Sequence, residues 1–573
     1  MTQDAARHQA VAAPTVAPSR CFDPWSLLRA VTVGALLVLV GVPLLFILLQ
    51  ALFPHLGSGS LAEPFSALLP SLVDKSVAGL LLNTLLLGTC VALASAVFGG
   101  ALGVIRATIP IPYARVWDIV LLTPFMIPPY ISTLGWIVVL QPRGYLHQLL
   151  GFHLGPFLFS LPGLVCIMAC HLFPAVYFAV SRSIASTSGE LTEAALMSGA
   201  TRLQVFRRVT APLALPAIVG ALLLVFAATI EEFGTPAVLA SQSHFEVLTT
   251  AIDQRVASWP IDLPGASALS LLLVLLALAA FTGQSRLIAG RSYVTISGKM
   301  KSQAASARPL AVFGGVTALA IAALITVGVP LFGILATAFT RSFSRGLTTS
   351  NFSLRNFELL FSNTGGAVQA MGLSFGLAIC AALVTASLGV AAAVLGRRRA
   401  AQGFDALGAL TALPNAAPGV VIALGLILAW NQPWLPVTLY GTSAMLILAY
   451  SCILLPYSAR YASAALTQIS PDLEAAALMA GASPAIVFRR ILLPLIWPSV
   501  AAAMMIVFAV SSRELVASIL LAPVGAHTMA TYVWKQFEQG SLGLGMAMSA
   551  VAIAVTTTLM LIATARLPGT ERS

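Results

Sequence analysis

The chain has 573 residues, of which 58% are hydrophobic and only 9% are charged, and its mean hydropathy is +0.94. Soluble chains carry roughly 25% charged residues, so this composition excludes a water-soluble globular protein and predicts an integral membrane protein. The net charge of +11 does not indicate a nucleic-acid partner, because most of the 30 Lys and Arg residues fall in loops between apolar runs.

Apolar runs recur along the chain with the length of about 20 residues that a helix needs to cross a bilayer. They predict an all-α integral membrane protein with about 12 transmembrane helices. The predicted spans are residues 28–53, 79–105, 116–140, 158–181, 211–233, 265–285, 309–340, 367–396, 403–430, 441–459, 493–513 and 543–566.

The loops on one side of this topology hold most of the Lys and Arg residues. Cytoplasmic loops carry such an excess, so both termini are expected in the cytoplasm. The predicted cytoplasmic tails are residues 1–26 and 567–573. The protein is then expected to be embedded in the lipid bilayer.

The chain also contains an internal repeat. The loop at residues 188–216 matches the loop at residues 470–498 at a constant offset of 282 positions, and an earlier block matches at an offset of 290 positions. The matched pairs include Gly199 with Gly481, Glu232 with Glu514, Pro124 with Pro414 and Pro128 with Pro418.

Each half holds an even number of predicted spans, so the two six-helix repeats are parallel. A pseudo-twofold axis along the membrane normal should relate them. The predicted transmembrane domains are residues 27–285 and 309–566, joined by a basic cytoplasmic linker at residues 286–308.

Each repeated loop joins the fourth and fifth spans of its half and is predicted to form helix, turn, helix. In the second loop Ser470 is a typical N-cap, Pro471 occupies the first helical position, and Asp472 favours the helix dipole. Ser188 and Glu190 play the same parts in the first loop. Gly199 and Gly481 are placed to end the first helix in a left-handed conformation.

The second helix of each loop is expected to lead back into the membrane. Thr201 and Gln204 have capping-box spacing, and the helices are expected to end near Pro212 and Pro494. Small residues leave one face open to close approach by another surface. Two such loops at equal places favour docking sites for a soluble partner over plain amphipathic connectors. The small residues are Ala194, Ala195, Ala475 and Ala476.

These loops resemble the EAA motif in the membrane subunits of type I ATP-binding-cassette (ABC) importers, in which Glu-Ala-Ala is followed after three residues by Gly. Glu193, Ala194, Ala195 and Gly199 fit the motif fully. The second loop departs from it, because Ala475 stands where the first loop has Glu193. The corresponding residues there are Glu474, Ala475, Ala476 and Gly481.

The resemblance covers both halves and implies the type I ABC importer permease fold in a bacterial inner membrane. It also implies that each loop is a coupling helix that docks into a groove of an ATPase subunit. Two copies of an ABC ATPase and a periplasmic solute-binding protein are the implied partners.

Within that family, the fused length is similar to that of ferric-iron transport permeases. A binding-protein-dependent importer of ferric iron is therefore the expected function. Permeases for 2-aminoethylphosphonate have a similar fused form and are the alternative. The segments that carry the iron resemblance are residues 291–299 (RSYVTISGK), 231–239 (EEFGTPAVL) and 513–518 (RELVAS).

The sequence contains no GxxxxGK[ST] phosphate-binding loop and no arrangement typical of an enzyme active site. The chain is therefore expected to be a transport subunit without an ATPase site and to bind no cofactor. ATP would be used by partner subunits. The sequence does not decide whether the chain holds a metal.

Glu231, Glu232 and Glu514 close long apolar runs. Acids at membrane depth are usually functional, because burying their charge is costly, so they are candidates for the outer mouth of a pathway that suits a cation such as Fe³⁺. The alternative is that they only mark span ends, with Glu514 forming a salt bridge to neighbouring Arg513 or to a partner. Proline pairs should bend the third and ninth spans, either at the gate or as plain packing bends; they are Pro124, Pro128, Pro414 and Pro418.

Two other classes of protein fit parts of the pattern. A secondary transporter can also have twelve spans, but it would carry charges deep inside its spans and lack long docking loops. A membrane scaffold without transport gives no reason for the repeated loops and the proline-broken spans.

Overall fold

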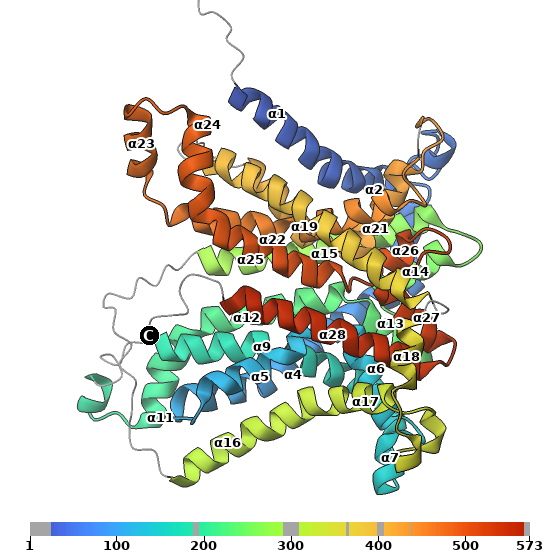
Figure 1. Cartoon of the computed structure of the whole chain (residues 1–573), viewed down its shortest axis with the longest axis vertical. Coiled ribbons are helices and arrows are strands. Elements are labelled where there is room, and N and C mark those ends of the chain that lie inside the picture. The colour runs from blue at the N-terminus through green and yellow to red at the C-terminus, as the bar shows by residue number, and fades with distance from the viewer. Residues whose placement is uncertain are drawn as a thin grey trace, which may run out of the picture.

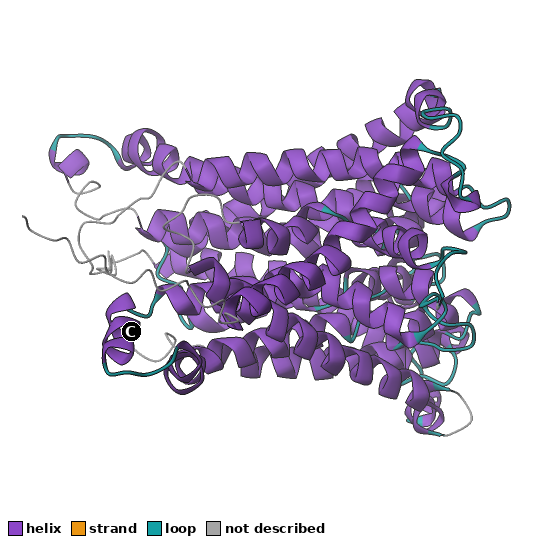
Figure 2. Ribbon diagram, turned by 90° about the horizontal axis from the view of Figure 1, so that it is seen from above, coloured by secondary structure: helices purple, strands orange, loops and turns teal. Residues whose placement is uncertain are grey.

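The computed structural model describes residues 24–186, 194–243, 245–289, 309–362, 366–397, 406–436 and 438–565. Over these residues the chain is helical apart from loops and an isolated bridge between Thr340 and Phe352. Ten helices are long and apolar enough to span a membrane, and two bent helix pairs complete the twelve predicted spans. Figure 2 shows the long helices side by side in one bundle, with short helices and loops at its two ends. The predicted all-α membrane fold is confirmed.

Each half uses six spans, of which the first and third are composite. In the first half they are α1 (Pro24–Leu36) with α2 (Val42–Leu52), α4 (Lys75–Thr108), α5 (Ala114–Met126) with α6 (Pro129–Leu140), α9 (Leu161–Ser186), α12 (Ala211–Glu231) and α15 (Leu263–Ala289). In the second half they are α16 (Pro309–Ala323) with α17 (Val329–Ala338), α19 (Ala367–Arg397), α20 (Ala406–Ala412) with α21 (Gly419–Trp430), α22 (Ser443–Thr467), α25 (Leu493–Ser511) and α28 (Leu542–Ala565).

Short helices connect the spans at the end of the bundle that the sequence predicts to be outer. They are α3 (Leu68–Val73), α7 (Tyr145–Leu150), α8 (Gly155–Leu158), α13 (Gly234–Ser243), α14 (Leu248–Ala257), α18 (Arg355–Phe361), α26 (Val516–Leu521) and α27 (Met529–Glu538).

The third and ninth spans are broken at the predicted proline pairs. The chain bends by 94° between α5 and α6 and by 111° between the helical turns at residues 407–416 and α21. Pro128 and Pro418 stand directly before the second helix of each pair, where their missing N–H groups leave carbonyls of the preceding turn without helical partners. Pro124 and Pro414 are buried in those preceding turns. The predicted bends are confirmed.

The prediction that the loop helices end near Pro212 and Pro494 is wrong. The helices α11 (Arg202–Val205) and α24 (Pro484–Val487) continue without a break into α12 and α25. A π-helical turn links each pair, at Phe206–Thr210 and at Phe488–Leu492. Such a turn shifts the hydrogen-bond pattern by one residue, which accommodates a proline two residues after it.

The first span of each half packs on the other half. Helix α2 lies against α21, and α17 lies against α6. A Cβ atom added to Gly425 would lie 2.6 Å from the carbonyl oxygen of Pro43, and one added to Gly135 would lie 2.5 Å from that of Pro330. In Figure 1, α1 accordingly runs beside α19, while α16 runs along the first half near α5. The two halves of the sequence are thus interlocked in space. The boundaries predicted for the two transmembrane domains stay predictions.

The repeat extends to matching hydrogen bonds. The Leu248 N–H donates to Thr84 Oγ1 at 3.0 Å, and in the second half the Met529 N–H donates to Ser374 Oγ at 2.8 Å. In both cases the first turn of an outer helix, α14 or α27, is fixed to the second span of its own half. The parallel relation of the halves is therefore visible at the level of single contacts.

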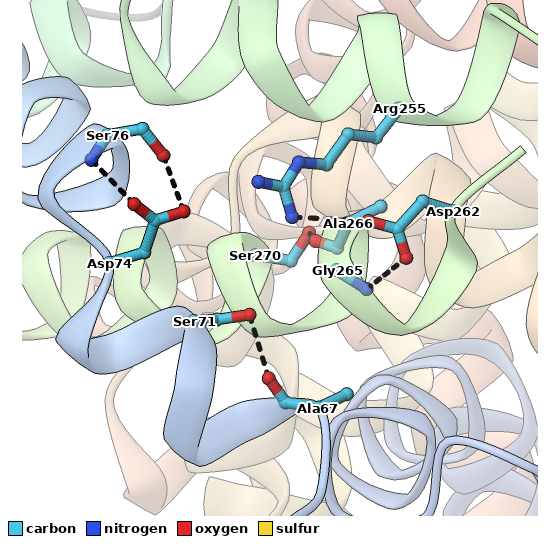
Figure 3. A network of polar contacts seen from close by, with 9 residues as sticks. All are labelled: Ala67, Ser71, Asp74, Ser76, Arg255, Asp262, Gly265, Ala266 and Ser270. Atoms are coloured by element: carbon cyan, nitrogen blue, oxygen red, sulfur yellow. Dashed lines mark hydrogen bonds and ion pairs between the residues drawn. The ribbon is translucent and has the colours of Figure 1, made fainter. Parts of the chain in front are cut away.

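Two aspartates cap helices at the outer end of the first half (Figure 3). Asp74 accepts hydrogen bonds from the Ser76 N–H at 2.9 Å and from the Ser76 hydroxyl at 2.7 Å, which lowers the pKa of Asp74. Asp262 accepts from the Gly265 N–H at 2.8 Å and forms an ion pair with Arg255 at 3.3 Å. Both carboxylates thus compensate free N–H groups at the start of a span, at α4 and α15.

The close helix crossings generate a prediction. Replacing Gly135 or Gly425 by Val forces a side chain into a backbone carbonyl, which costs roughly 1–3 kcal/mol at each crossing. Both variants should give much less folded protein in fluorescence-detected size-exclusion chromatography. The controls are Gly372→Val and Gly376→Val on α19, because an added Cβ meets nothing within 4 Å there. Equal yields from crossing and control variants would contradict the packing described.

Candidate functional site

The repeated loops project from the same end of the bundle (Figures 1 and 2). In Figure 1, α11 lies at one side of that end, and α23 (Pro471–Met479) with α24 lies at the other. The short outer helices, such as α14 and α27, occupy the opposite end. This placement agrees with the predicted sidedness of the loops and gives two separate surfaces at equivalent positions.

The second loop has the predicted helix-turn-helix form. The Ser470 hydroxyl oxygen accepts a hydrogen bond from the Asp472 N–H at 3.2 Å, as expected of an N-cap. At the other end of α23, the Ala482 N–H donates to Ala477 O at 3.0 Å around Gly481, whose φ is +84°. This is the left-handed helix ending that glycine permits.

The first loop repeats this geometry where the structure describes it. Gly199 also has a φ of +84°, and the Ala200 N–H donates to Ala195 O at 3.1 Å. Thr201 and Gln204 form the predicted capping box, with bonds of 2.8 and 3.3 Å between the backbone N–H of one and the side chain of the other. Residues 187–193, including Ser188, Glu190 and Glu193, lie outside the described residues.

The small residues of the motif lie on accessible surface. Ala194, Ala475 and Ala476 are exposed and Ala195 is half-buried. An added Cβ at Gly199 or Gly481 would meet nothing within 4 Å, so these glycines serve the backbone turn and not close packing. A coupling role for these residues stays a prediction.

The sequence reasoning missed two exposed apolar side chains. Met197 and Met479 are each 89% exposed at the end of the first loop helix, next to the exposed Leu196 and Leu478. Methionine is flexible and adapts well to a partner surface. The repeat itself holds the signal, because these four residues match in pairs at the 282-residue offset.

The two loops are attached to the bundle differently. In the second loop, Glu474 forms an ion pair with Arg397 at the end of α19, with Nη2 and Oε1 3.2 Å apart and both side chains about one-fifth exposed. Arg397 also donates to the carbonyl of Leu466, and to that of Ile469 at 2.8 Å. The motif acid of the second loop is therefore engaged within the chain.

In the first half, the arginine that ends the second span has another partner. Arg106 donates to Asp118 on α5 through Nε at 3.1 Å and Nη2 at 2.9 Å. The Tyr177 hydroxyl donates to the same carboxylate at 2.5 Å. Arg106 thus joins three spans to one another, whereas Arg397 joins its span to the loop.

Glu232 and Glu514 cap the helices that follow them. The Glu232 carboxylate accepts from the Thr235 N–H at 2.9 Å, at the start of α13. The Glu514 carboxylate accepts from the Val516 N–H at 3.0 Å and the Ala517 N–H at 2.9 Å, at the start of α26. A carboxylate at a helix N-terminus is favourable, so these matched acids have a structural role. The ion pair between Glu514 and Arg513 that the alternative reading allowed is not among the interactions of the described residues.

Arg513 instead contacts the other half of the chain. Its guanidinium donates to the carbonyl oxygen of Met126, the last residue of α5. This carbonyl lies at the break of the third span, where Pro128 prevents the helix from continuing. A basic side chain from the second half therefore satisfies a backbone group that the proline break leaves free.

Further polar groups from both halves surround Arg513. His171 on α9, Tyr130 on α6 and Tyr457 on α22 lie within electrostatic range of its charge, and Tyr130 is also within range of Glu514. The Nδ1 atom of His171 is buried without a hydrogen-bond partner among the described residues. Within the same part of the chain, no group of three or more His, Cys, Asp or Glu side chains is arranged to hold a metal ion.

Interlocked parallel halves of six spans, each with a helix-turn-helix loop at the same end, define a two-half transport permease. Two segments, residues 96–292 and 385–568, match the family described as the binding-protein-dependent transport system inner membrane component. The chain belongs to this family, carries its domain twice and has the type I ABC permease fold. It is a multi-pass inner-membrane protein.

The chain is similar to permeases named for iron transport. It is 27% identical over 472 residues to the ferric transport system permease protein FbpB of Actinobacillus pleuropneumoniae, covering 81% of this chain and 67% of that one. It is 27% identical over 512 residues to the Fe(3+)-transport system permease protein FbpB 2 of Haemophilus influenzae, covering 87% and 91%. A Salmonella typhi relative named as a 2-aminoethylphosphonate transport system permease protein, PhnV, is 28% identical over 37% of this chain.

The attachment of the second loop generates one prediction. Arg397→Gln should loosen the loop more than Glu474→Gln, because it also removes the bonds to the Leu466 and Ile469 carbonyls. The rate of proteolytic cleavage within residues 471–483 should rise in that order, and transport should fall several-fold in Arg397→Gln. The matched control is the exposed Arg355→Gln at the other end of the bundle. Wild-type cleavage in both loop variants would refute this attachment.

The capping acids generate a second prediction. Glu232→Ala and Glu514→Ala remove the acceptors at the starts of α13 and α26, at a cost of about 1 kcal/mol each. Their melting temperatures in detergent should fall, whereas Glu232→Gln and Glu514→Gln keep one acceptor oxygen and should fall less. The exposed Glu358→Ala serves as control. If the alanine variants melt like the wild type, the acids are not acting as caps.

Proposed function

We propose that this chain forms the translocation pathway of an ATP-driven, binding-protein-dependent importer for ferric iron. The observation that carries the proposal is the pair of protruding loops, each with a glycine at a φ of +84° and an exposed methionine at the tip of its helix. Two identical turns at equivalent places suit two copies of one partner. The family membership supports an importer permease, and the names of the FbpB relatives support iron as cargo.

The proposed partners are two copies of an ABC ATPase at the loop end and a periplasmic solute-binding protein at the opposite end. The chain would bind no cofactor itself, and ATP would be bound and hydrolysed by the ATPase copies. The absence of a GxxxxGK[ST] loop from the sequence is consistent with this division of labour. Both termini would be cytoplasmic, as the distribution of Lys and Arg predicts.

In the proposed cycle, closure of the ATPase pair moves the coupling loops together, and the spans that continue from them move with them. The helices α12 and α25 transmit this motion, because each runs unbroken from its loop to the acid-rich outer end. The pathway would follow the interface between the halves, past Glu231 and the broken spans. Cargo crosses as the protein alternates between two states that differ in their contacts with the partners.

The alternatives are weaker on specific grounds. Relatives named for iron transport match over most of the chain, whereas those named for 2-aminoethylphosphonate match about a third of it. A secondary transporter would have no function for two projecting loops of the same geometry.

Proline in place of the two loop glycines tests the coupling role. Proline requires a φ near −65°, so Gly199→Pro with Gly481→Pro should destroy both turns. The double variant should remain in the membrane but lose its co-purifying ATPase and its transport. Gly199→Ala with Gly481→Ala is the control and should lose only part of both, at about 1 kcal/mol per turn. A chain that purifies alone and transports in liposomes without ATP would overturn the proposal.

The iron assignment has its own measurement. Purified complex in nanodiscs should show ATPase activity that rises several-fold with an iron-loaded binding protein. The same protein without iron should have a smaller effect. Stimulation only by a binding protein loaded with 2-aminoethylphosphonate would retain the importer and replace the cargo.

A further inference from the structure

An apolar cavity of about 350 Å³ lies where α1, α19 and α25 meet. Its lining is apolar apart from two indoles and the hydroxyl of Ser387, which donates to the Leu383 carbonyl at 2.8 Å. Three of its lining side chains are exposed, namely Leu28 (40%), Leu383 (52%) and Trp497 (53%). In Figure 1, α1 forms the edge of the bundle beside α19, so the cavity lies at the perimeter of the protein.

The cavity has the depth of one membrane leaflet. Along α19 its lining runs from Leu383 to Val394, which is roughly 17 Å of helix, whereas half of a hydrocarbon core of about 30 Å is roughly 15 Å. This stretch belongs to the part of α19 nearer to Arg397, at the loop end of the bundle. Trp25 lines the cavity from the first turn of α1, and tryptophan is enriched where a span leaves the hydrocarbon. The dimensions therefore suit an acyl chain of the loop-side leaflet.

Three arginines lie beside the lining residues at the loop end. Arg489 and Arg490 directly follow Phe488, which lines the cavity, and both are exposed. Arg29 is exposed next to Leu28 on α1. None of the ion pairs between described residues includes these arginines. Basic residues that border a pocket between spans on the cytoplasmic side attract anionic lipid headgroups, so the charges complement such a lipid.

The wall of the cavity also supports the second loop. Val390, Val394 and Val500 line the cavity and belong to one buried hydrophobic cluster. Ala477 of α23 and Ala482 directly after that helix pack against the same cluster. A ligand in the cavity therefore contacts the side chains on which the second loop rests.

The first half does not repeat these features. The π-helical turn in the first span begins at Leu37, and that of its counterpart begins at Leu324, 287 residues later. At this offset, and at the offset of 282 residues for the fifth spans, both tryptophans and one arginine of the site correspond to aliphatic residues. Residues that one half alone carries favour a specific ligand over a general packing role. The pairs are Trp25 with Val312, Arg29 with Val316 and Trp497 with Leu215.

We propose that this cavity binds an acyl chain of an anionic phospholipid from the loop-side leaflet, and that the bound lipid stabilises the second loop. The phosphate is held by Arg29, Arg489 and Arg490. Because membrane lipid is as apolar as the cavity, affinity comes from close packing of the chain and from these charges. Lipid binding is independent of the proposed importer function, whereas an effect of the lipid on ATP hydrolysis rests on it.

Lipid retention tests the site. The full chain in detergent is offered equal amounts of phosphatidylglycerol and phosphatidylcholine, and bound lipid is counted by native mass spectrometry. The wild type should retain phosphatidylglycerol in preference. Arg489→Gln with Arg490→Gln should lower this retention by about an order of magnitude. Ala391→Phe, which fills the cavity from α19, should lower it severalfold, and so should Trp497→Leu, which introduces the residue of the first half.

The first half supplies matched controls for retention. Arg207→Gln with Arg208→Gln changes the equivalent arginines, and Ala101→Phe changes the residue 290 positions before Ala391. Both controls should retain phosphatidylglycerol like the wild type. Equal losses in the two halves would show general attraction to a basic surface and would overturn the site. Binding that appears only after deletion of residues 2–23 would make the N-terminus of the chain the occupant and overturn the lipid assignment.

A second measurement follows the loop without any partner. Phosphatidylglycerol should slow proteolytic cleavage within residues 471–483 severalfold relative to phosphatidylcholine, and Ala391→Phe should remove this protection. Cleavage within residues 194–201 of the first loop should not depend on the lipid. Cleavage of the second loop that ignores the lipid would overturn its stabilising role.

The effect on coupling is measured separately. In nanodiscs with its ATPase, the wild-type complex should hydrolyse ATP severalfold faster in phosphatidylglycerol than in phosphatidylcholine, and Ala391→Phe should lose the difference. A chain that binds lipid as described but never engages an ATPase would overturn the importer and leave the lipid site intact. An ATPase that engages the chain, with equal lipid retention in the wild type and all three site variants, would overturn the lipid site alone.

Discussion

Two close helix crossings organise the molecule. In lipid there is little hydrophobic drive between helices, so association depends on small residues that let backbones approach. Gly135 on Pro330 and Gly425 on Pro43 supply such contacts between the halves. Because each first span is committed to the opposite half, the proline-broken spans, which carry these glycines, are fixed at the interface. The polar groups near Met126 gather there as a result.

The scaffold is nearly symmetric, whereas its charges are not. The π-helical turns, the loop glycines and the capping acids occur in matched pairs. By contrast, Arg397 holds a loop while Arg106 holds a span, and Glu231 corresponds to Arg513. Symmetric parts suit an interaction with two equal partners. Asymmetric charges suit a single cargo, which crosses one pathway and meets a different surface on each side of it.

Much of this architecture could be predicted from the sequence. Apolar length predicts the spans, the proline pairs predict the two breaks, and helix capping rules predict the Ser470 and Thr201 contacts, because all of these depend on residues close in the chain. The packing of Gly135 on Pro330, the Arg397–Glu474 pair and the Arg513 contact join distant segments, so no local pattern reveals them. Pro212 misled the prediction because a π-helical turn, which has no sequence signature here, absorbs it.

The interlocked first spans also have a consequence for biogenesis. The segment around Pro43 enters the membrane early, yet its packing partner Gly425 emerges roughly 400 residues later, a delay of about 20 to 80 s at about 5–20 residues per second. During that interval α2 must wait in lipid with its polar Gln50 and its glycine-facing surface uncovered. The bond between the Gln50 side chain and the Pro54 carbonyl, 2.9 Å long, is formed within the same segment. It lets the waiting helix satisfy part of that amide before the second half of the chain exists.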